Sequence, residues 1–157
     1  MKARLVLLCL FALNCFLLGQ TPKPPTAAEL KTFQETKVKA EKGDAPAQSN
    51  LGRMYANGRG VAKDDVEAVK WYHEGAERGN DFAQYKLGYM YETGRSVAKD
   101  KVEAYKWYLL AKAQGRDGGG SAEVRIPGIK RDLTPEQRAE GQRRAREWKP
   151  KLPQKAP

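Results

Sequence analysis

Apolar residues recur through the middle of the chain with a helical spacing, and the whole pattern repeats 36 positions later. In residues 43–72, Ala47, Leu51 and Tyr55 follow one another at intervals of four, which places them on one face of a helix. Residues 79–108 repeat this stripe, and 19 of the 30 aligned positions are identical. A fixed period in this range is typical of stacked helical repeats. The pattern therefore predicts an all-α protein.

Each repeat divides into two helices at residues that favour helix ends. The first helix is predicted to begin at Asp44 in one repeat and at the Asn80–Asp81 pair in the other, with Asp81 and Gln84 in a capping-box spacing. The second helices are predicted to begin at Asp64 and Asp100, and the helices to end at Gly58, Gly94, Gly79 and Gly115. These signals predict two full helix-turn-helix repeats, at residues 43–78 and 79–114.

The positions held alike in both repeats are predicted to form the core of the stack. They are Ala47, Leu51, Gly52, Tyr55 and Trp71 in the first repeat, and Ala83, Leu87, Gly88, Tyr91 and Trp107 in the second. Gly52 and Gly88 stand inside helices, where glycine is about 1 kcal/mol less favourable than alanine. Their recurrence predicts a close approach of two helices, at which any side chain would clash.

Shorter helical patterns flank the repeats. Residues 27–42, opened by Thr26 and Glu29 in a capping-box spacing, are predicted to form an N-terminal capping helix. After the second repeat, RDGGGS is predicted to be a flexible joint, and Pro127 argues against a long helix there. A Thr-Pro-Glu-Gln start then predicts a capping helix at residues 134–148.

The chain ends differ in composition from the repeat domain, which is predicted to span residues 26–148. A basic start and a short apolar run predict a signal peptide at residues 1–19, followed by a Pro-rich linker at 20–25. We therefore expect export to the periplasm or beyond the cell, with an N-terminal membrane anchor as the alternative if the signal is not cleaved. Residues 149–157 are predicted to be a disordered tail.

Composition narrows the range of functions. Both cysteines, Cys9 and Cys15, lie in the predicted signal, so the mature chain would have no disulfides and no thiolate chemistry. The formal charge is +10, and residues 115–157 hold eleven Lys or Arg against six Asp or Glu. Such a basic region could attract an anionic envelope component. Export argues against nucleic acid as a partner.

The pattern A-Q-x-x-L-G-x-M-Y-x-x-G-R-x-V-A-K-D-x-V-E-A-x-K-W-Y resembles the Sel-one-like repeat, a relative of the tetratricopeptide repeat. The resemblance covers residues 43–115, and Leu133–Gln137 is similar to the start of the terminal helix in many bacterial members. It implies a right-handed α-solenoid, with two full repeats and a capping helix at each end, that binds a protein or peptide on its concave face. We expect no catalysis, no cofactor and no metal.

The two repeats differ on one side of their first helices, where a binding face would vary. By resemblance to tetratricopeptide units, this side lines the concave groove. The candidate partner-binding residues are Ser49, Arg53, Asn57, Phe82, Tyr85, Tyr89 and Glu92. Aromatic rings are suited to anchoring an interface, and the Arg53 guanidinium could hold a carboxylate through two hydrogen bonds. The alternative is that these residues are half exposed and bind nothing.

Two other functions stay open. Ser96-Val97-Ala98-Lys99 has the S-x-x-K pattern of penicillin-recognising enzymes, which would suit an envelope hydrolase acting on β-lactams or peptidoglycan. Its alignment with the Gly60 segment instead predicts a turn between helices. The basic C-terminal region could alternatively anchor the protein to an anionic envelope polymer. His73 and Glu77 lie one helical turn apart, and we predict an ordinary surface pair rather than a metal site.

Overall fold

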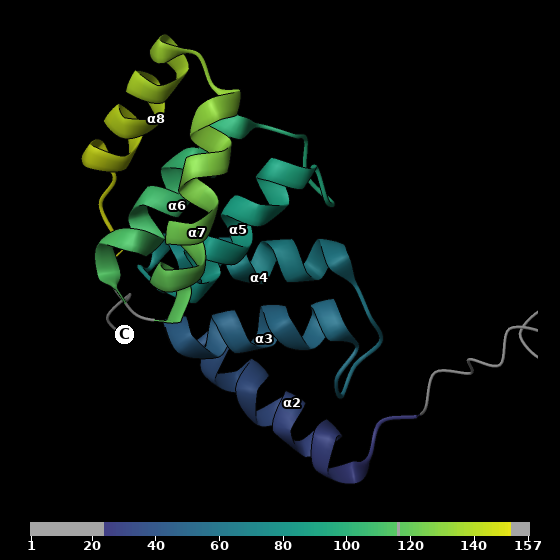
Figure 1. Cartoon of the computed structure of the whole chain (residues 1–157). Helices are drawn as coiled ribbons and strands as arrows, with labels where there is room; N and C mark the ends of the chain where they lie inside the picture. Colours follow the sequence, from purple (N-terminus) through teal and green to yellow (C-terminus); the bar gives the residue numbers. More distant parts are fainter. Residues whose placement is uncertain (1–23, 116, 152–157) are drawn as a thin grey trace, which may run out of the picture.

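Seven helices and no strand make up the part of the chain that the computed structural model describes, residues 24–115 and 117–151. They are α2 (Ala27–Glu41), α3 (Ala45–Asn57), α4 (Asp65–Glu77), α5 (Asp81–Thr93), α6 (Lys101–Gln114), α7 (Asp117–Asp132) and α8 (Pro135–Glu147). Successive helices from α2 to α7 pack against one another, α7 also covers α5, and α8 covers α6 (Figure 1). The predicted all-α repeat solenoid is confirmed.

Several sequence predictions fall wholly or mostly outside the described residues. The predicted signal peptide lies there, as does most of the Pro-rich linker and the end of the predicted tail from residue 152 onward. Within the described ranges, no helix is both long and apolar enough to cross a membrane.

Helix ends follow the capping signals closely, with one exception. Thr26 and Thr134 each form a capping box, with Glu29 and Gln137 respectively. At the start of α5, however, the cap is Asn80, whose Oδ1 accepts a hydrogen bond from the amide of Ala83 at 2.8 Å. The predicted Asp81–Gln84 box is wrong because Gln84 points inward, and its Nε2 donates to the carbonyl of Ala76 at 3.2 Å.

This inward glutamine recurs in both repeats. Gln48 donates from Nε2 to the carbonyl of Ala40 at 3.1 Å, as Gln84 does to Ala76. Both glutamine side chains are buried, and each binds the last turn of the preceding helix. Each repeat is thereby joined to the previous unit by a buried hydrogen bond, in addition to the one that the same carbonyl accepts from the amide of Gly43 or Gly79.

The predicted close approach at the two helical glycines is confirmed. A Cβ atom at Gly52 would lie 2.9 Å from the ring of Tyr72, and one at Gly88 would lie 2.8 Å from the ring of Tyr108. The two helices of each repeat therefore meet through a glycine on one and a tyrosine ring on the other. The third such contact, Gly141 of α8 on the ring of Tyr105, holds the C-terminal cap against α6.

The predicted core positions divide into buried and half-buried groups. Ala47, Leu51, Gly52, Ala83, Leu87, Gly88 and Trp107 are buried, whereas Tyr55, Tyr91 and Trp71 are half buried. Trp107 is covered by Trp148, with ring centroids 6.3 Å apart in an edge-to-face arrangement. The two equivalent tryptophans thus have different surroundings.

The segment after the second repeat corrects our expectation. Residues 117–132, most of the predicted flexible joint and the stretch predicted to be non-helical, form α7, with Pro127 inside it. Ala122, Ile129 and Leu133 are buried in one cluster with residues of α6. This tertiary packing outweighs the poor helix propensity of glycine and proline, which is a weak determinant beside burial.

The start of the predicted disordered tail is also ordered against the fold. The amide of Lys151 donates to the carbonyl of Glu77 at 2.7 Å, and its Nζ lies 3.6 Å from a carboxylate oxygen of the same residue. The chain beyond α8 therefore returns to α4 across the end of the second repeat, near Gly79 and Trp148.

Candidate functional site

A pocket of about 370 Å³ opens between the first helices of the two repeats, α3 and α5. Four residues predicted to bind a partner line it: Arg53 and Asn57 from α3, and Phe82 and Tyr89 from α5. Tyr72 of α4 and Met90 of α5 also line it, although both side chains are largely buried. We call this site the α3–α5 pocket.

A second hollow continues this surface toward the N-terminal cap. It has a volume of about 300 Å³ and lies between α2 and α3, with Thr32, Thr36 and Asn50 among its lining residues. Arg53 and Asn57 line both hollows, so these two side chains stand on the ridge between them. A ligand longer than one pocket would pass over them.

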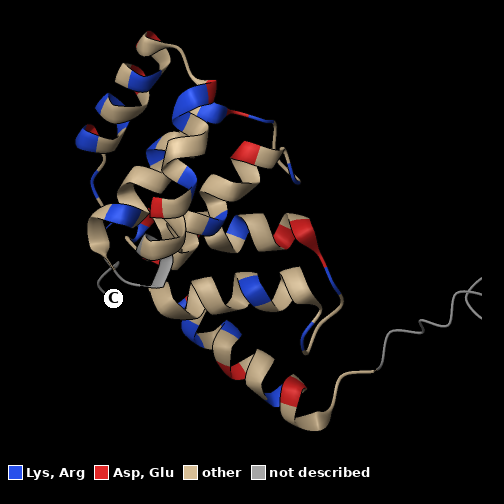
Figure 2. Ribbon diagram, in the orientation of Figure 1, with Lys and Arg blue, Asp and Glu red and all other residues tan. Residues whose placement is uncertain are grey.

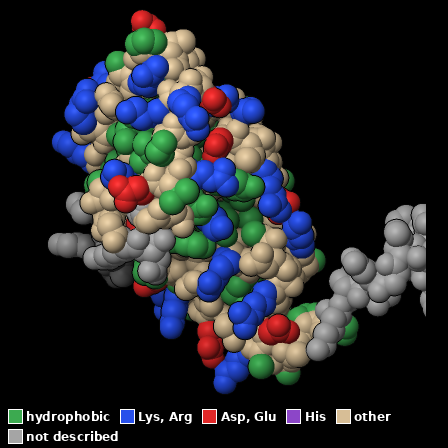
Figure 3. Space-filling view, viewed as in Figure 1, with side chains coloured by type: hydrophobic (Ala, Val, Ile, Leu, Met, Phe, Trp, Pro, Cys, Tyr) green, Lys and Arg blue, Asp and Glu red, His purple; other side chains and the backbone are tan. Residues whose placement is uncertain are grey.

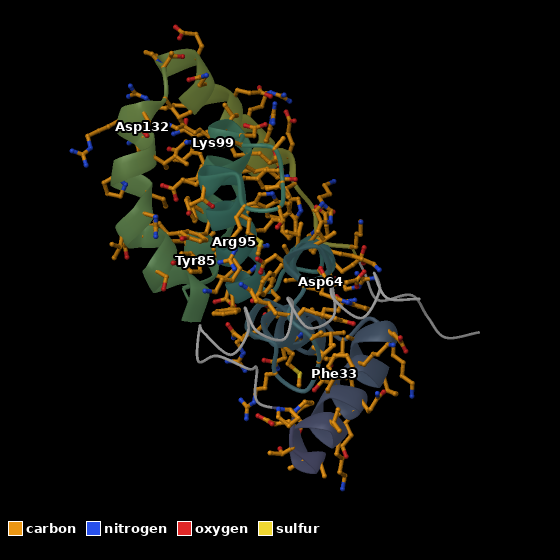
Figure 4. The ribbon with its side chains drawn as sticks, turned by 90° about the vertical axis from the view of Figure 1, so that its right-hand side faces the viewer. Phe33, Asp64, Tyr85, Arg95, Lys99 and Asp132 are labelled. Atoms are coloured by element: carbon orange, nitrogen blue, oxygen red, sulfur yellow. The ribbon has the colours of Figure 1, made fainter. Side chains whose placement is uncertain are left out.

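The other three predicted residues do not line the α3–α5 pocket. Ser49 is buried, and its backbone lies against Gly75 of α4, so its predicted place on an open face is wrong. Tyr85 packs on Tyr108 with ring centroids 6.0 Å apart, on the side of the stack that α7 covers (Figure 4). We remove these residues from the candidate site.

Glu92 is engaged inside the protein as well. Its Oε2 accepts a hydrogen bond from the hydroxyl of Tyr108 at 2.6 Å and lies 3.3 Å from a guanidinium nitrogen of Arg125. The Arg125 guanidinium in turn stands 4.8 Å from the centre of the Tyr89 ring. The network joins α5, α6 and α7, and sequence reasoning missed it because the helical state of α7 was not predicted.

Sequence reasoning also missed the basic residues of the pocket. Lys63, Lys86 and Arg95 line it together with Arg53. Lys86 follows Phe82 by four positions and precedes Tyr89 by three, a spacing that places all three on one helix face and could have revealed it. Lys and Arg side chains gather with hydrophobic ones on this side of the molecule, over α3 and α5 (Figure 3).

The pKa values of groups in the pocket reflect its burial and its positive charge. Burial, followed by the charges of Arg125, Arg53 and Arg95, lowers the pKa of the Lys86 ammonium. Burial raises the pKa of the Tyr72 phenol to about 12, while Arg53 and Arg95 act in the opposite direction. Both shifts have desolvation as their main cause, and both show that guanidinium groups of two repeats act on one site.

The S-x-x-K segment lies in the loop between α5 and α6. Ser96 and Lys99 are exposed, and no hydrogen bond joins their side chains. Ser96 has a left-handed backbone with φ of 58°, as does its counterpart Gly60 with φ of 72°. The loop geometry is thus that of a turn shared by both repeats.

The side chains of His73 and Glu77 contact different residues. The His73 ring packs on Trp107 with centroids 6.3 Å apart, and Glu77 lies beside Lys151. In the described part of the chain, no three His, Cys, Asp or Glu side chains come close enough to hold a metal ion together.

Two of the four arginines of the C-terminal helix are paired with acidic residues. Arg143 pairs with Glu140 and Glu147, and Arg144 pairs with Glu140 and, across the helix interface, with Glu103 of α6. Acidic and basic residues are interspersed along α8 in Figure 2. These pairs reduce the charge that α8 can offer to an anionic polymer.

Comparison with known proteins agrees with the repeat architecture. The Sel1 repeat, which is the Sel-one-like repeat that the sequence resembles, matches residues 45–80 and 81–115. A Sel1 repeat protein from Oxalobacter formigenes has 45% identity and a TM-score of 0.56, over 59% of this chain and 68% of that one. No curated protein matches the chain significantly.

A longer relative has the same fold. The protein c5321, a protective antigen present in uropathogenic Escherichia coli strains and displaying an SLR fold, has 29% identity and a TM-score of 0.69. The match covers 76% of this chain but only 25% of that protein, so this chain spans about a quarter of its length. Sel1 repeats generally mediate protein–protein interactions rather than catalysis. The chain belongs to the Sel1 repeat family and is an α-helical repeat scaffold.

Proposed function

We propose that this protein is an exported scaffold that binds a protein or peptide partner in the α3–α5 pocket. The main support is that α3 and α5, from different repeats, line one pocket with both polar and aromatic side chains. Aromatic rings anchor interfaces through large buried areas, and polar groups fix the orientation of a bound chain. Arg53 and Asn57 supply the polar groups, and Phe82 and Tyr89 supply the rings.

Binding at this site needs no bond chemistry. The adjoining hollow between α2 and α3 extends the surface, and Thr32, Thr36 and Asn50 offer hydroxyl and amide groups to a peptide backbone. An extended partner segment would lie across α2, α3 and α5, with Arg53 and Asn57 beneath its middle. Such a site is long enough to recognise sequence through several side chains at once.

Site-specific photo-crosslinking tests this placement. A benzoylphenylalanine introduced in place of Phe82 should crosslink to a partner in envelope extract, and the same band should weaken when Arg53→Ala is added. The control position is Ala139, which is exposed on α8, away from the pocket. Equal crosslinking to the same partner from positions 82 and 139 would contradict the assignment of the pocket.

Export is supported by the basic and apolar pattern of residues 1–19. The mass of the protein recovered from the cell envelope is the direct test. A mass corresponding to a chain that begins near Gln20 is the expected result. A full-length mass, retained with membranes after a salt wash, would instead favour the N-terminal anchor.

A further inference from the structure

The α3–α5 pocket holds more positive charge than its neighbours neutralise. Arg53, Lys63, Lys86 and Arg95 line it, and Asp65 is the one carboxylate paired with any of them among the described residues. The guanidinium of Arg95 binds both Asp65 oxygens, at 2.9 and 3.1 Å, and the ammonium of Lys63 lies 3.7 Å from the same carboxylate. One negative charge therefore serves two cations, and no carboxylate of the described residues pairs with the other two.

Lys86 is the most constrained of these cations. Its side chain is half buried, and its ammonium lies 5.1 Å from the centre of the Phe82 ring and 5.4 Å from that of Tyr85. Within the described residues, no carboxylate pairs with it. Ring faces attract a cation weakly in comparison with an ion pair, so part of the desolvation of this ammonium stays uncompensated.

Arg53 is available for a ligand in a different way. Its guanidinium is exposed, and its one hydrogen bond to another described side chain is with Asn50 Oδ1 at 3.1 Å. The remaining donors of the guanidinium form a planar fork that matches the two oxygens of a carboxylate. Arg53 stands where the two hollows meet, so a carboxylate bound there would lie in the middle of the site.

The surroundings of Lys86 differ from those of two other lysines of the repeats. Lys70 pairs with Glu67 and Lys106 with Glu103, each on its own helix. Lys86 is half buried beside two aromatic rings instead, where water replaces a missing counter-charge less well than it does on the open surface. A partly desolvated cation without a paired carboxylate favours the binding of an anion at this site.

We propose that the pocket selects an acidic segment of its partner, in which carboxylates reach Lys86 and Arg53 and an apolar side chain packs on Phe82 and Tyr89. The proposal rests on the proposed function and names the class of its ligand. The rings favour a peptide over a purely ionic polymer, because a polyanion has no apolar group to cover them.

Two random peptide libraries provide a test that does not require the partner to be identified first. One contains Asp, Glu, Leu, Phe, Ala and Gly, and the other replaces Asp and Glu by Asn and Gln. Both are passed over the immobilised protein at physiological salt, and bound peptides are quantified by mass spectrometry. Peptides with carboxylates and at least one apolar residue should be retained about tenfold more than their amide counterparts, the effect of one charge-assisted hydrogen bond.

Variants that each remove one positive charge test whether the pocket cations cause the preference for acidic peptides. Lys86→Gln and Arg53→Gln should each reduce the affinity of the best acidic peptide about tenfold. Lys149→Gln and Arg146→Gln remove the same charges from exposed positions near the C-terminus and should change the affinity less than about twofold. Circular dichroism of each variant checks that the helices are intact.

Three outcomes would overturn the proposal. One is equal retention of the two libraries. Another is an equal loss of affinity in the pocket variants and the C-terminal variants. The third is tighter, Lys86-dependent binding of polyphosphate or of vesicles with anionic lipid, which would make the occupant an anionic polymer. If crosslinking from position 82 succeeds while the libraries bind equally, the acidic selectivity fails and the proposed function stands.

Discussion

Trp71 and Trp107 occupy the same position in successive repeats, yet only Trp107 is fully buried, at 1% exposure. Trp148 and His73 pack on its ring, whereas Trp71 is half buried beside the smaller cluster of α2 and α3. The first repeat borders a half unit, and the second lies between two complete layers. Identical residues are therefore expected to contribute differently to the free energy of unfolding, because the units on either side of a repeat determine how deeply its residues are buried.

The same asymmetry affects other aligned positions. Gly60 lies against the backbone of α2, while its counterpart Ser96 is exposed. The phenol of Tyr108 donates to Glu92, while that of Tyr72 makes no hydrogen bond with another described residue. Paired substitutions at such positions measure how much of the stability comes from the repeat itself and how much from the unit beside it.

The largest difference is expected at the two tryptophans. Trp107→Ala should lower the free energy of unfolding by about 3–5 kcal/mol, because it leaves a cavity in the buried cluster that Trp107 forms with residues of α4 and α5. Trp71→Ala should lower it by about 1–2 kcal/mol, because a half-exposed ring loses less buried area. Urea denaturation followed by circular dichroism measures both. Equal losses would show that the repeats contribute independently of their position in the stack.

Gly60→Ser is expected to be the next in size. A Cβ atom at this position would lie 2.4 Å from the carbonyl oxygen of Glu29, so α2 would have to move away from α3. The left-handed backbone adds strain for any residue with a side chain, and the two effects together should cost about 2–4 kcal/mol. Faster hydrogen exchange confined to α2 and α3 would confirm the cause. Unchanged exchange in α2 would contradict it.

Much of this architecture could be predicted because it repeats in the sequence. The 36-residue period and the capping residues predict the helices of both repeats. Gly52 and Gly88 predict the close approach of the two helices within each repeat. The helix α7 could not be predicted, because its propensity is poor and its stability comes from burying Ala122 and Ile129 against α6. Local sequence contains little information about such long-range packing.

The candidate site was only half predictable for the same reason. Arg53, Asn57, Phe82 and Tyr89 follow from the helix periodicity, and the structure places them around one pocket. Tyr85 and Glu92 share that periodicity but are covered or bonded by α6 and α7, which periodicity does not reveal. Tyr85 and Glu92 therefore have a structural role instead of the predicted binding role. Lys63, Lys86 and Arg95 replace them in the candidate site.

The phenol pair should show a smaller contrast than Gly60. Tyr108→Phe should lower the free energy of unfolding by about 1–2 kcal/mol, because Glu92 loses a charge-assisted hydrogen bond but keeps Arg125 beside it. Tyr72→Phe should change it by less than about 0.5 kcal/mol, since no such bond is lost. Thermal and urea unfolding measure both variants. A larger loss for Tyr72→Phe would mean that its hydroxyl has a partner in solution.

Alkaline pH sharpens this comparison. The pKa of each phenol is raised above the ordinary value of 10.0, by burial in both and by Glu92 as well in Tyr108. A group with a raised folded-state pKa holds its proton more tightly when folded, so its contribution is fully present below pH 10 and is lost as pH rises through the folded value. Wild-type stability should therefore fall above pH 10, and Tyr72→Phe should fall less steeply. Parallel pH profiles would contradict the burial of this phenol.

Ser96→Gly should have a small effect of the opposite sign, an increase in stability. Ser96 has a φ of 58°, a conformation that costs a residue with a side chain about 1–2 kcal/mol. Glycine relieves that strain but loses more backbone entropy on folding, by about 0.5–1 kcal/mol. The net gain should be about 0.5–1 kcal/mol in the free energy of unfolding, measured by urea denaturation.

Because Gly60 already stands at this position in the first repeat, the substitution makes the two turns alike. A loss of stability would mean that the serine side chain forms an interaction that outweighs the strain of its backbone. The S-x-x-K hypothesis would then need a direct assay with a chromogenic β-lactam.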